Sequence, residues 1–188
     1  MDDRVRDNTG LASADGSIQV RVSDISQLFD TLDPFPFPER DLDKDAEEFI
    51  VSWARELPHD QSLKIVLHVP AAELQKHKPE EIRMAMNRYF DYRAGVISRD
   101  LNELFRIGRL SLGIGLTVLA AALGLTQLIA GLFSMTPLGR FFEESLIIVA
   151  WVANWRPIEI FLYDWWPIVR KRNLYRRLAQ ATVELRAY

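Results

Sequence analysis

The chain has 188 residues, a formal net charge of −3 and no cysteine, which excludes disulfides, thiolate metal ligands and cysteine nucleophiles. Its mean hydropathy is close to neutral, but charge is segregated: residues 1–78 carry nine Lys and Arg against 16 Asp and Glu, whereas residues 110–188 carry eight against five. An acidic front and a basic, apolar back indicate two different environments.

The first part of the chain predicts a leader and two strands. Residues 1–16 are small and acidic, contain no apolar run of the kind found in a secretory signal, and are expected to be a disordered leader. Residues 17–23 alternate, with Ile18, Val20 and Val22 on one face, which predicts a half-buried strand. Residues 62–70 alternate in the same way and predict a second strand.

Between these strands, residues 41–57 have the pattern of an amphipathic helix. Asp45 is expected to be the N-cap, with Glu48 at capping-box spacing, and Pro58 should end the helix. Residues 17–78 are therefore predicted to form a small α+β domain of the strand-helix-strand type. The apolar face of the predicted helix consists of Phe49, Ile50, Trp53 and Leu57.

Residues 79–109 predict a long amphipathic connecting helix that begins at Pro79. Two interpretations of its apolar seam stay open: the helix packs on its own domain, or it pairs with a second copy as a coiled coil. The seam consists of Ile82, Met86, Tyr89, Arg93, Val96, Ile97, Leu101 and Leu104.

Residues 110–133 are 24 residues without a charge, and a transmembrane helix needs about 20. This stretch is predicted to be the first transmembrane helix. Its small residues are expected to allow close helix packing in lipid, and they include Ser111, Gly113, Gly115, Ala120 and Gly124.

A second span follows the predicted external loop at residues 134–140. Its uncharged part, residues 145–155, covers only about 16 Å, which is too short to cross a hydrocarbon core of about 30 Å. Basic residues nevertheless gather both before the first span and after residue 164, and such residues collect on the cytoplasmic side. Residues 141–164 are therefore predicted to be transmembrane helix 2, which leaves both termini cytoplasmic.

The charges inside this second stretch are the candidate site. With Pro137 as the apex of the hairpin, Arg156 and Glu159 would lie opposite Gly115 to Val118 and could pair at i,i+3 spacing. Either the pair is interfacial, or it faces the interior of an oligomeric bundle. The interface anchors are predicted to be Arg109, level with Trp165, together with Asp164, Trp166, Arg170, Lys171 and Arg172.

Residues 165–188 are predicted to form a basic amphipathic cytoplasmic helix. It could lie on anionic headgroups or dock on the acidic front domain. Nucleic acid is an unlikely partner, because basic residues beside a membrane are expected from topology alone.

No motif for catalysis or metal binding occurs in the sequence. GxSxG, P-loop, GxGxxG and HExxH patterns are absent, and no cofactor is expected. Asp41, Asp43 and Asp45 resemble the start of a calcium loop, but the required Gly and Glu are missing, so no metal site is expected.

Taken together, the patterns predict a mainly α membrane protein: a two-helix transmembrane hairpin with a small N-terminal α+β cytoplasmic domain and long amphipathic flanking helices. The favoured function is a non-enzymatic, self-associating, membrane-anchored module that recognises a cytoplasmic protein. The alternative is a small oligomeric channel or transporter that uses Arg156 and Glu159. The lipid bilayer is the first partner, and a bacterial inner membrane is weakly preferred.

Overall fold

The computed structural model describes the chain except for residues 1–16, 32, 35–38, 59–60, 77 and 134–136, so the predicted leader lies outside the described residues. The chain divides into two compact units. The residues up to Val96 form the first unit together with Lys171–Tyr188, and Ile97–Arg170 form the second. The first unit is therefore discontinuous, because residues from both ends of the chain build it.

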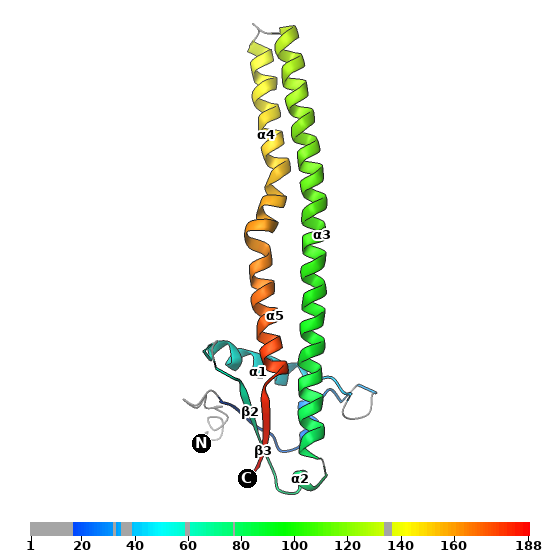
Figure 1. The fold of residues 1–188 in the computed structure, drawn as a ribbon, viewed down its shortest axis with the longest axis vertical. Coiled ribbons are helices and arrows are strands. Elements are labelled where there is room, and N and C mark those ends of the chain that lie inside the picture. The colour runs from blue at the N-terminus through cyan, green and yellow to red at the C-terminus, as the bar shows by residue number, and fades with distance from the viewer. Residues whose placement is uncertain (1–16, 32, 35–38, 59–60, 77, 134–136) are drawn as a thin grey trace, which may run out of the picture. The chain divides into compact units, whose positions relative to one another are not determined.

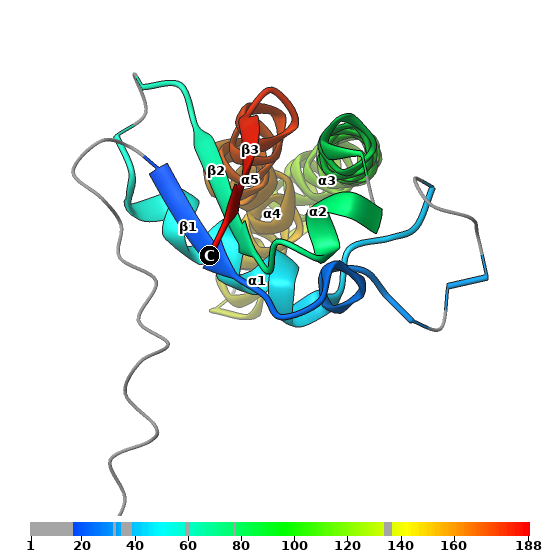
Figure 2. The same cartoon turned by 90° about the horizontal axis from the view of Figure 1, so that it is seen from below.

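The first unit contains a parallel three-stranded sheet in the order β1-β2-β3 (Figure 2). The strands are β1 (Ser17–Arg21), β2 (Lys64–Val69) and β3 (Thr182–Ala187). The register sets Ile18, Ile65 and Val183 in one row, and all three are buried. The two predicted strands are confirmed with slightly shorter bounds.

The third strand corrects the prediction of a helix over residues 165–188. The helix ends at Ala179, and β3 follows after a short turn. The physical reason is the two-residue alternation of TVELRA, which buries Val183 and leaves Thr182 and Arg186 exposed. A helix would have scattered these residues around its axis.

Helix α1 (Lys44–Glu56) joins β1 to β2 and is capped by Asp43 rather than by the predicted Asp45. The carboxylate of Asp43 accepts the N–H of Asp45 at 2.9 Å, and the backbone of Asp43 is still extended. Leu57 is extended because Pro58 follows, and this ends the helix as expected. Ile50 and Leu57 are buried as predicted, but Phe49 and Trp53 are only half-buried. The helix buries Glu47, Val51 and Ala54 in addition.

Two short helices complete the connections of the first unit. The 3-10 helix η1 (Ile25–Leu28) follows β1, and its N-cap Asp24 accepts the N–H of Ser26 at 2.7 Å. Helix α2 (Glu73–Lys76) follows β2 and leads to the long helix α3.

Helix α3 (Pro79–Phe133) runs without interruption for 55 residues, as the predicted connecting helix and first span together require. The first part of its apolar seam is buried inside this chain: Ile82 and Met86 have no exposed surface, and Tyr89 is 7% exposed. These residues are not free to form an intermolecular coiled coil. The interpretation in which the helix packs on its own domain is therefore the one that the structure supports.

The return path consists of three helical segments that follow one another directly. They are α4 (Pro137–Glu159), a π-helix η2 (Ile160–Asp164) and α5 (Trp165–Ala179). In the second unit α3 and α4 run antiparallel as a hairpin (Figure 1). The predicted loop over 134–140 is too long, because residues 137–140 already belong to α4, with Pro137 at its start.

The last part of α5 docks on the front domain, which was one of two possibilities left open by the sequence. Arg177 donates from Nη2 to the carbonyl oxygens of Pro58, at 2.7 Å, and Gln61, at 3.1 Å. Lys64 of β2 pairs with Glu184 of β3 at 2.6 Å. The residues after the hairpin thus complete the domain that the residues before it begin.

Candidate functional site

Within the hairpin, α3 and α4 approach each other closely at Gly115. The amide of Asn154 donates from Nδ2 to the carbonyl oxygen of Gly115 at 3.1 Å and to that of Ala150, in its own helix, at 2.8 Å. A Cβ atom at Gly115 would stand 2.6 Å from Oδ1 of Asn154 and 3.1 Å from the carbonyl oxygen of Ala153. Only glycine leaves room for this contact.

Pro157 alters the hydrogen bonding of the Ala153 carbonyl group, which faces Gly115 on the other helix. Proline has no N–H, so it cannot donate to the carbonyl oxygen of Ala153 four residues earlier. A Cβ atom at Gly115 would lie 3.1 Å from this oxygen, so glycine lets the two helices approach here. The π-helix η2 begins three residues later, as is common where the regular ladder of a helix is disturbed.

The predicted packing residues separate into two groups. Gly115 is buried against α4 and Ser111 is half-buried, but Gly113, Ala120 and Gly124 are exposed. A Cβ atom at Gly113 or Gly124 would meet nothing within 4 Å. These exposed residues do not take part in packing within the hairpin.

Sequence reasoning missed Gly108. A Cβ atom there would lie 2.9 Å from Cγ2 of Ile160 and 3.2 Å from Cζ of Phe161. The signal was present, because Gly108, Gly115 and Ala122 recur at seven-residue spacing, which places them on one seam of a helix pair.

These contacts correct the predicted register of the hairpin. Gly115 lies opposite Ala153 and Asn154, and Gly108 lies opposite Ile160 and Phe161. The levels of Arg156 and Glu159 therefore fall between those of Gly108 and Gly115, about 8 Å nearer to Arg109 than predicted. The prediction was wrong because α4 begins at Pro137, which moves the apex of the hairpin towards α3.

Arg156 is the centre of a charged cluster. Its Nη1 lies 2.9 Å from Oε2 of Glu159, so the predicted pair does form. The same atom lies 3.1 Å from Oδ2 of Asp164, which was predicted to be only an interface anchor. The arginine side chain is 57% exposed, and both carboxylates come from its own helical run.

The remaining predicted anchors form an aromatic and basic group in α5. Trp165 donates from Nε1 to the carbonyl oxygen of Phe161 at 3.0 Å. The guanidinium of Arg170 lies 5.5 Å from the ring of Trp166, and Nζ of Lys171 lies 5.9 Å from the ring of Tyr175. Within the described part of the chain, no carboxylate lies within 4 Å of the cations of Arg109, Arg170, Lys171 or Arg172.

A second charged cluster, in the first unit, was not predicted. Glu47 of α1 is 9% exposed and accepts hydrogen bonds from the hydroxyls of Tyr89 (α3) and Tyr175 (α5), each at 2.5 Å. Nε of Arg93 lies 3.3 Å from the same carboxylate. Glu47 therefore ties three helices together.

Burial and hydrogen bonding act in opposite directions on this carboxyl group. Burial alone would raise the pKa of Glu47, but the hydroxyls of Tyr175 and Tyr89 and the charge of Arg93 hold the pKa below its usual value. Burial and the nearby carboxylate raise the pKa of Tyr175 to about 12, and the same causes raise the pKa of Tyr89. The cluster is a carboxylate held by neutral tyrosines.

Comparisons with protein-family models, with curated proteins and with solved structures find no match. Among the described residues, no group of three or more His, Asp or Glu side chains could hold a metal ion.

Proposed function

We propose that the protein is a membrane-anchored, self-associating interaction module whose hairpin crosses a bilayer twice and holds the sheet domain on the cytoplasmic side. The observation that carries this proposal is the sheet itself. Strand β3 follows the hairpin and pairs along its whole length with β2, which precedes it. A chain that enters a bilayer along α3 must return to the side it left before this pairing can form.

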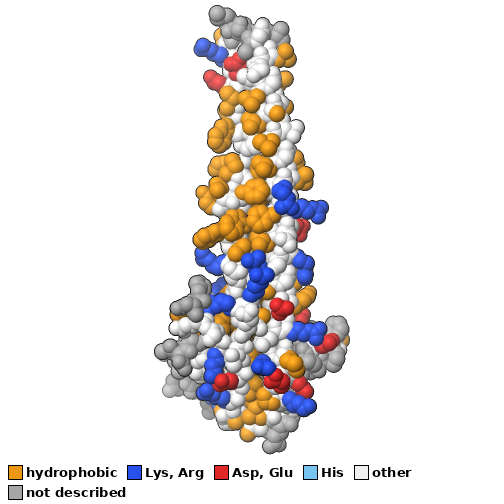
Figure 3. Space-filling view, in the orientation of Figure 1, with side chains coloured by type: hydrophobic (Ala, Val, Ile, Leu, Met, Phe, Trp, Pro, Cys, Tyr) orange, Lys and Arg blue, Asp and Glu red, His pale blue; other side chains and the backbone are white. Residues whose placement is uncertain are grey.

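The surface of the hairpin supports the membrane part of the proposal. Two helices are long and apolar enough to span a membrane, and only 11% and 17% of their apolar windows are buried. A core helix of a soluble protein would be mostly buried. Trp151, Val152 and Trp155 are each more than half exposed, and Figure 3 shows apolar side chains over much of the visible face of the hairpin.

The charges support the orientation. Arg106 and Arg109 precede the apolar stretch of α3, and the basic run 170–172 follows that of α4. At the other end of the hairpin, Arg140 is opposed by Glu143 and Glu144. Because unopposed Lys and Arg collect on the cytoplasmic side, this distribution favours a cytoplasmic sheet domain.

Because the chain has no cysteine, single cysteines can report the topology cleanly. Arg140→Cys should react with a membrane-impermeant maleimide in intact cells. Thr182→Cys, on the exposed side of β3, should react only after the membrane is opened. Labelling of both positions in intact cells would refute the double crossing.

The sheet edge at β3 supports recognition of a protein partner. Thr182 and Tyr188 donate their N–H groups to β2, at the carbonyl oxygens of Leu63 and Val69. Alternate residues of a strand direct their N–H groups the same way, so Val183, Leu185 and Ala187 direct theirs away from β2. An extended segment of a partner can pair with such an edge.

A proline at this edge tests partner recognition. Ala187→Pro removes one outward N–H without removing a bond to β2, whereas the control Ala187→Val keeps it. Capture of a partner by the full chain in nanodiscs should be lost with proline and kept with valine. Equal capture by the two variants would exclude this edge.

Self-association is supported by the exposed pair Ala120 and Gly124, which has the small-xxx-small spacing of close helix contacts. Gly124→Leu should lower the mass of the detergent-solubilised particle, and an unchanged mass would contradict the idea. The alternative of a channel or transporter has less support, because both carboxylates that pair with Arg156 come from its own helical run.

A further inference from the structure

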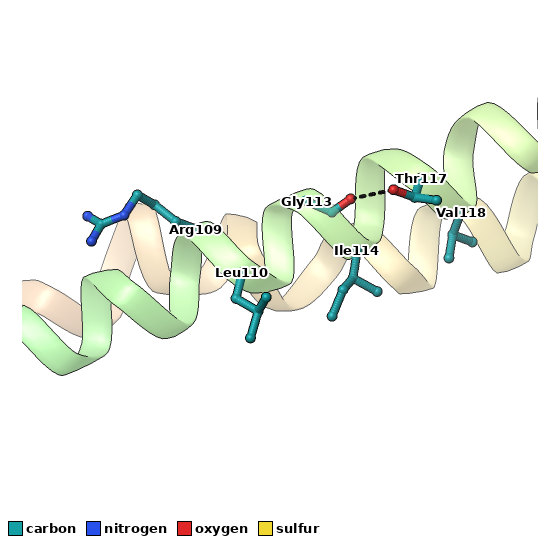
Figure 4. Close-up of a pocket in the computed structure, with 6 residues that line it drawn as sticks. All are labelled: Arg109, Leu110, Gly113, Ile114, Thr117 and Val118. Atoms are coloured by element: carbon teal, nitrogen blue, oxygen red, sulfur yellow. Dashed lines mark hydrogen bonds between the residues drawn. The ribbon is translucent and has the colours of Figure 1, made fainter.

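A groove of about 460 Å³ follows α3 just after its last basic residue. It is lined by Arg109, Leu110, Gly113, Ile114, Thr117 and Val118 (Figure 4). All six residues belong to the second unit, and Gly113 is about 200° around the helix from Gly115. The groove is therefore distinct from the packing seam of the hairpin.

The groove has a floor at Gly113 and a wall of branched apolar side chains. At Gly113 a side chain is missing, and a Cβ atom there would meet nothing within 4 Å. Leu110, Ile114 and Val118 are spaced four residues apart and project on the same side of the helix, which forms one wall (Figure 4). The hydroxyl of Thr117 donates to the carbonyl oxygen of Gly113 at 2.9 Å, so it does not require a polar ligand.

One end of the groove is cationic. Arg109 is the last charge before the uncharged stretch 110–133, and among the described residues no carboxylate lies within 4 Å of its guanidinium. From Arg109 to Val118 the groove extends for about 13 Å along the helix. A ligand that fits this arrangement has one anionic group followed by an apolar chain.

We propose that the groove binds one anionic phospholipid, with its phosphate at Arg109 and an acyl chain along Gly113. The proposal rests on the proposed membrane crossing, which places Arg109 at headgroup level. A second copy of the chain fits less well. In a symmetric dimer within one membrane, the two Arg109 side chains would lie at the same depth, one helical turn from the contact at Gly113, and would repel each other.

The probes are phosphatidylglycerol and phosphatidylcholine with identical acyl chains, added to the delipidated full chain in detergent and counted by native mass spectrometry. Wild type should retain one phosphatidylglycerol with about fivefold preference, since one cation near an anionic headgroup contributes about 1 kcal/mol. Arg109→Gln should abolish the preference, and Gly113→Leu should fill the groove and abolish retention of either lipid.

Two matched controls separate the groove from general effects. Arg106→Gln removes an exposed cation one turn earlier that does not line the groove, and Gly131→Leu adds the same side chain to an exposed glycine elsewhere on α3 that would meet nothing within 4 Å. Both controls should retain the lipid as wild type does, and the melting temperature of each variant confirms that it is folded.

Three results would overturn the lipid site: equal retention of both lipids by wild type, equal effects of Arg109→Gln and Arg106→Gln, or retention by Gly113→Leu. The cysteine labelling distinguishes this failure from that of the proposed function. Labelling that confirms two crossings, together with no lipid preference, removes only the lipid site, whereas labelling without crossings removes both.

Discussion

The two charged clusters of this chain are built from similar groups but in opposite ways. Glu47 is 9% exposed and receives hydrogen bonds from two other helices, whereas Arg156 has a 57% exposed side chain and partners within its own helical run. A buried charge must be satisfied by its neighbours in the fold, whereas a pair near the end of the proposed crossing can also be solvated by water and headgroups. The difference indicates that the Glu47 cluster holds the domain together and that the Arg156 cluster solvates its own charges.

The largest expected effect is the loss of Glu47. Glu47→Ala leaves the two tyrosine hydroxyls and Arg93 without their acceptor, and we expect a loss of about 3 kcal/mol in the free energy of unfolding. The neighbouring exposed Glu48 is the matched control, and Glu48→Ala should change the free energy by less than about 0.5 kcal/mol. Denaturant titration of the full chain measures the free energy of unfolding of both variants. Equal effects of the two substitutions would contradict a stabilising role of the Glu47 cluster.

The hairpin seam gives the next largest effect. Gly115→Ala forces a Cβ atom against Asn154 and the backbone of Ala153, so we expect a destabilisation of about 1–3 kcal/mol. Gly113→Ala places the same methyl group in open space and should cost nothing measurable. Thermal melts in one detergent compare the two variants, and similar melting temperatures would contradict the register at Gly115.

The titration of Tyr175 tests the hydrogen bond from its hydroxyl to the carboxylate of Glu47. The pKa of Tyr175 is raised from 10.0 to about 12, so the folded state holds this proton more tightly than the unfolded state. Its contribution to stability is fully present below pH 10 and is lost as pH rises from 10 to about 12. Stability measured against pH should show this decline in wild type and a smaller one in Tyr175→Phe; identical profiles would contradict it.

The smallest effect is expected at Arg156. Glu159 lies at the level of Arg109, where the uncharged stretch ends, so its carboxylate can be solvated without its partner, and Arg156→Gln should reduce the free energy of unfolding by less than about 1 kcal/mol. The measurement is the same melt as for Gly115→Ala. A loss of free energy as large as that of Glu47→Ala would show that the Arg156 cluster stabilises the protein as strongly as the Glu47 cluster does.

The elements with strong periodicity were predictable from the sequence. The alternation of residues 17–23 and 62–70, the capped helix between them and the uncharged stretch of α3 all correspond to observed elements. Strand β3 was missed because its alternation follows directly on a basic helix, and a short amphipathic run is ambiguous between the two structures. A tertiary contact, the pairing with β2, decides the outcome.

The sites were harder to predict than the elements. Glu47 is one of several acidic residues near the start of α1. Nothing in the neighbouring sequence reveals that Tyr89 and Tyr175, from distant parts of the chain, donate hydrogen bonds to its carboxylate. Arg156 and Glu159 were identified because charge is rare in an apolar stretch, but their depth depended on the hairpin apex. A shift of the apex by two or three residues moved the pair along α3 towards Arg109.

The pairing of β2 with β3 joins the residues before the hairpin to those after it, and amide hydrogen exchange of β2 measures this pairing. The full chain is compared with a chain that ends at Gln180 and so lacks β3. If residues after the hairpin complete the sheet, the amides of Lys64–Val69 should be protected in the full chain and should exchange much faster in the shortened one. Equal protection of these amides in both chains would contradict the account.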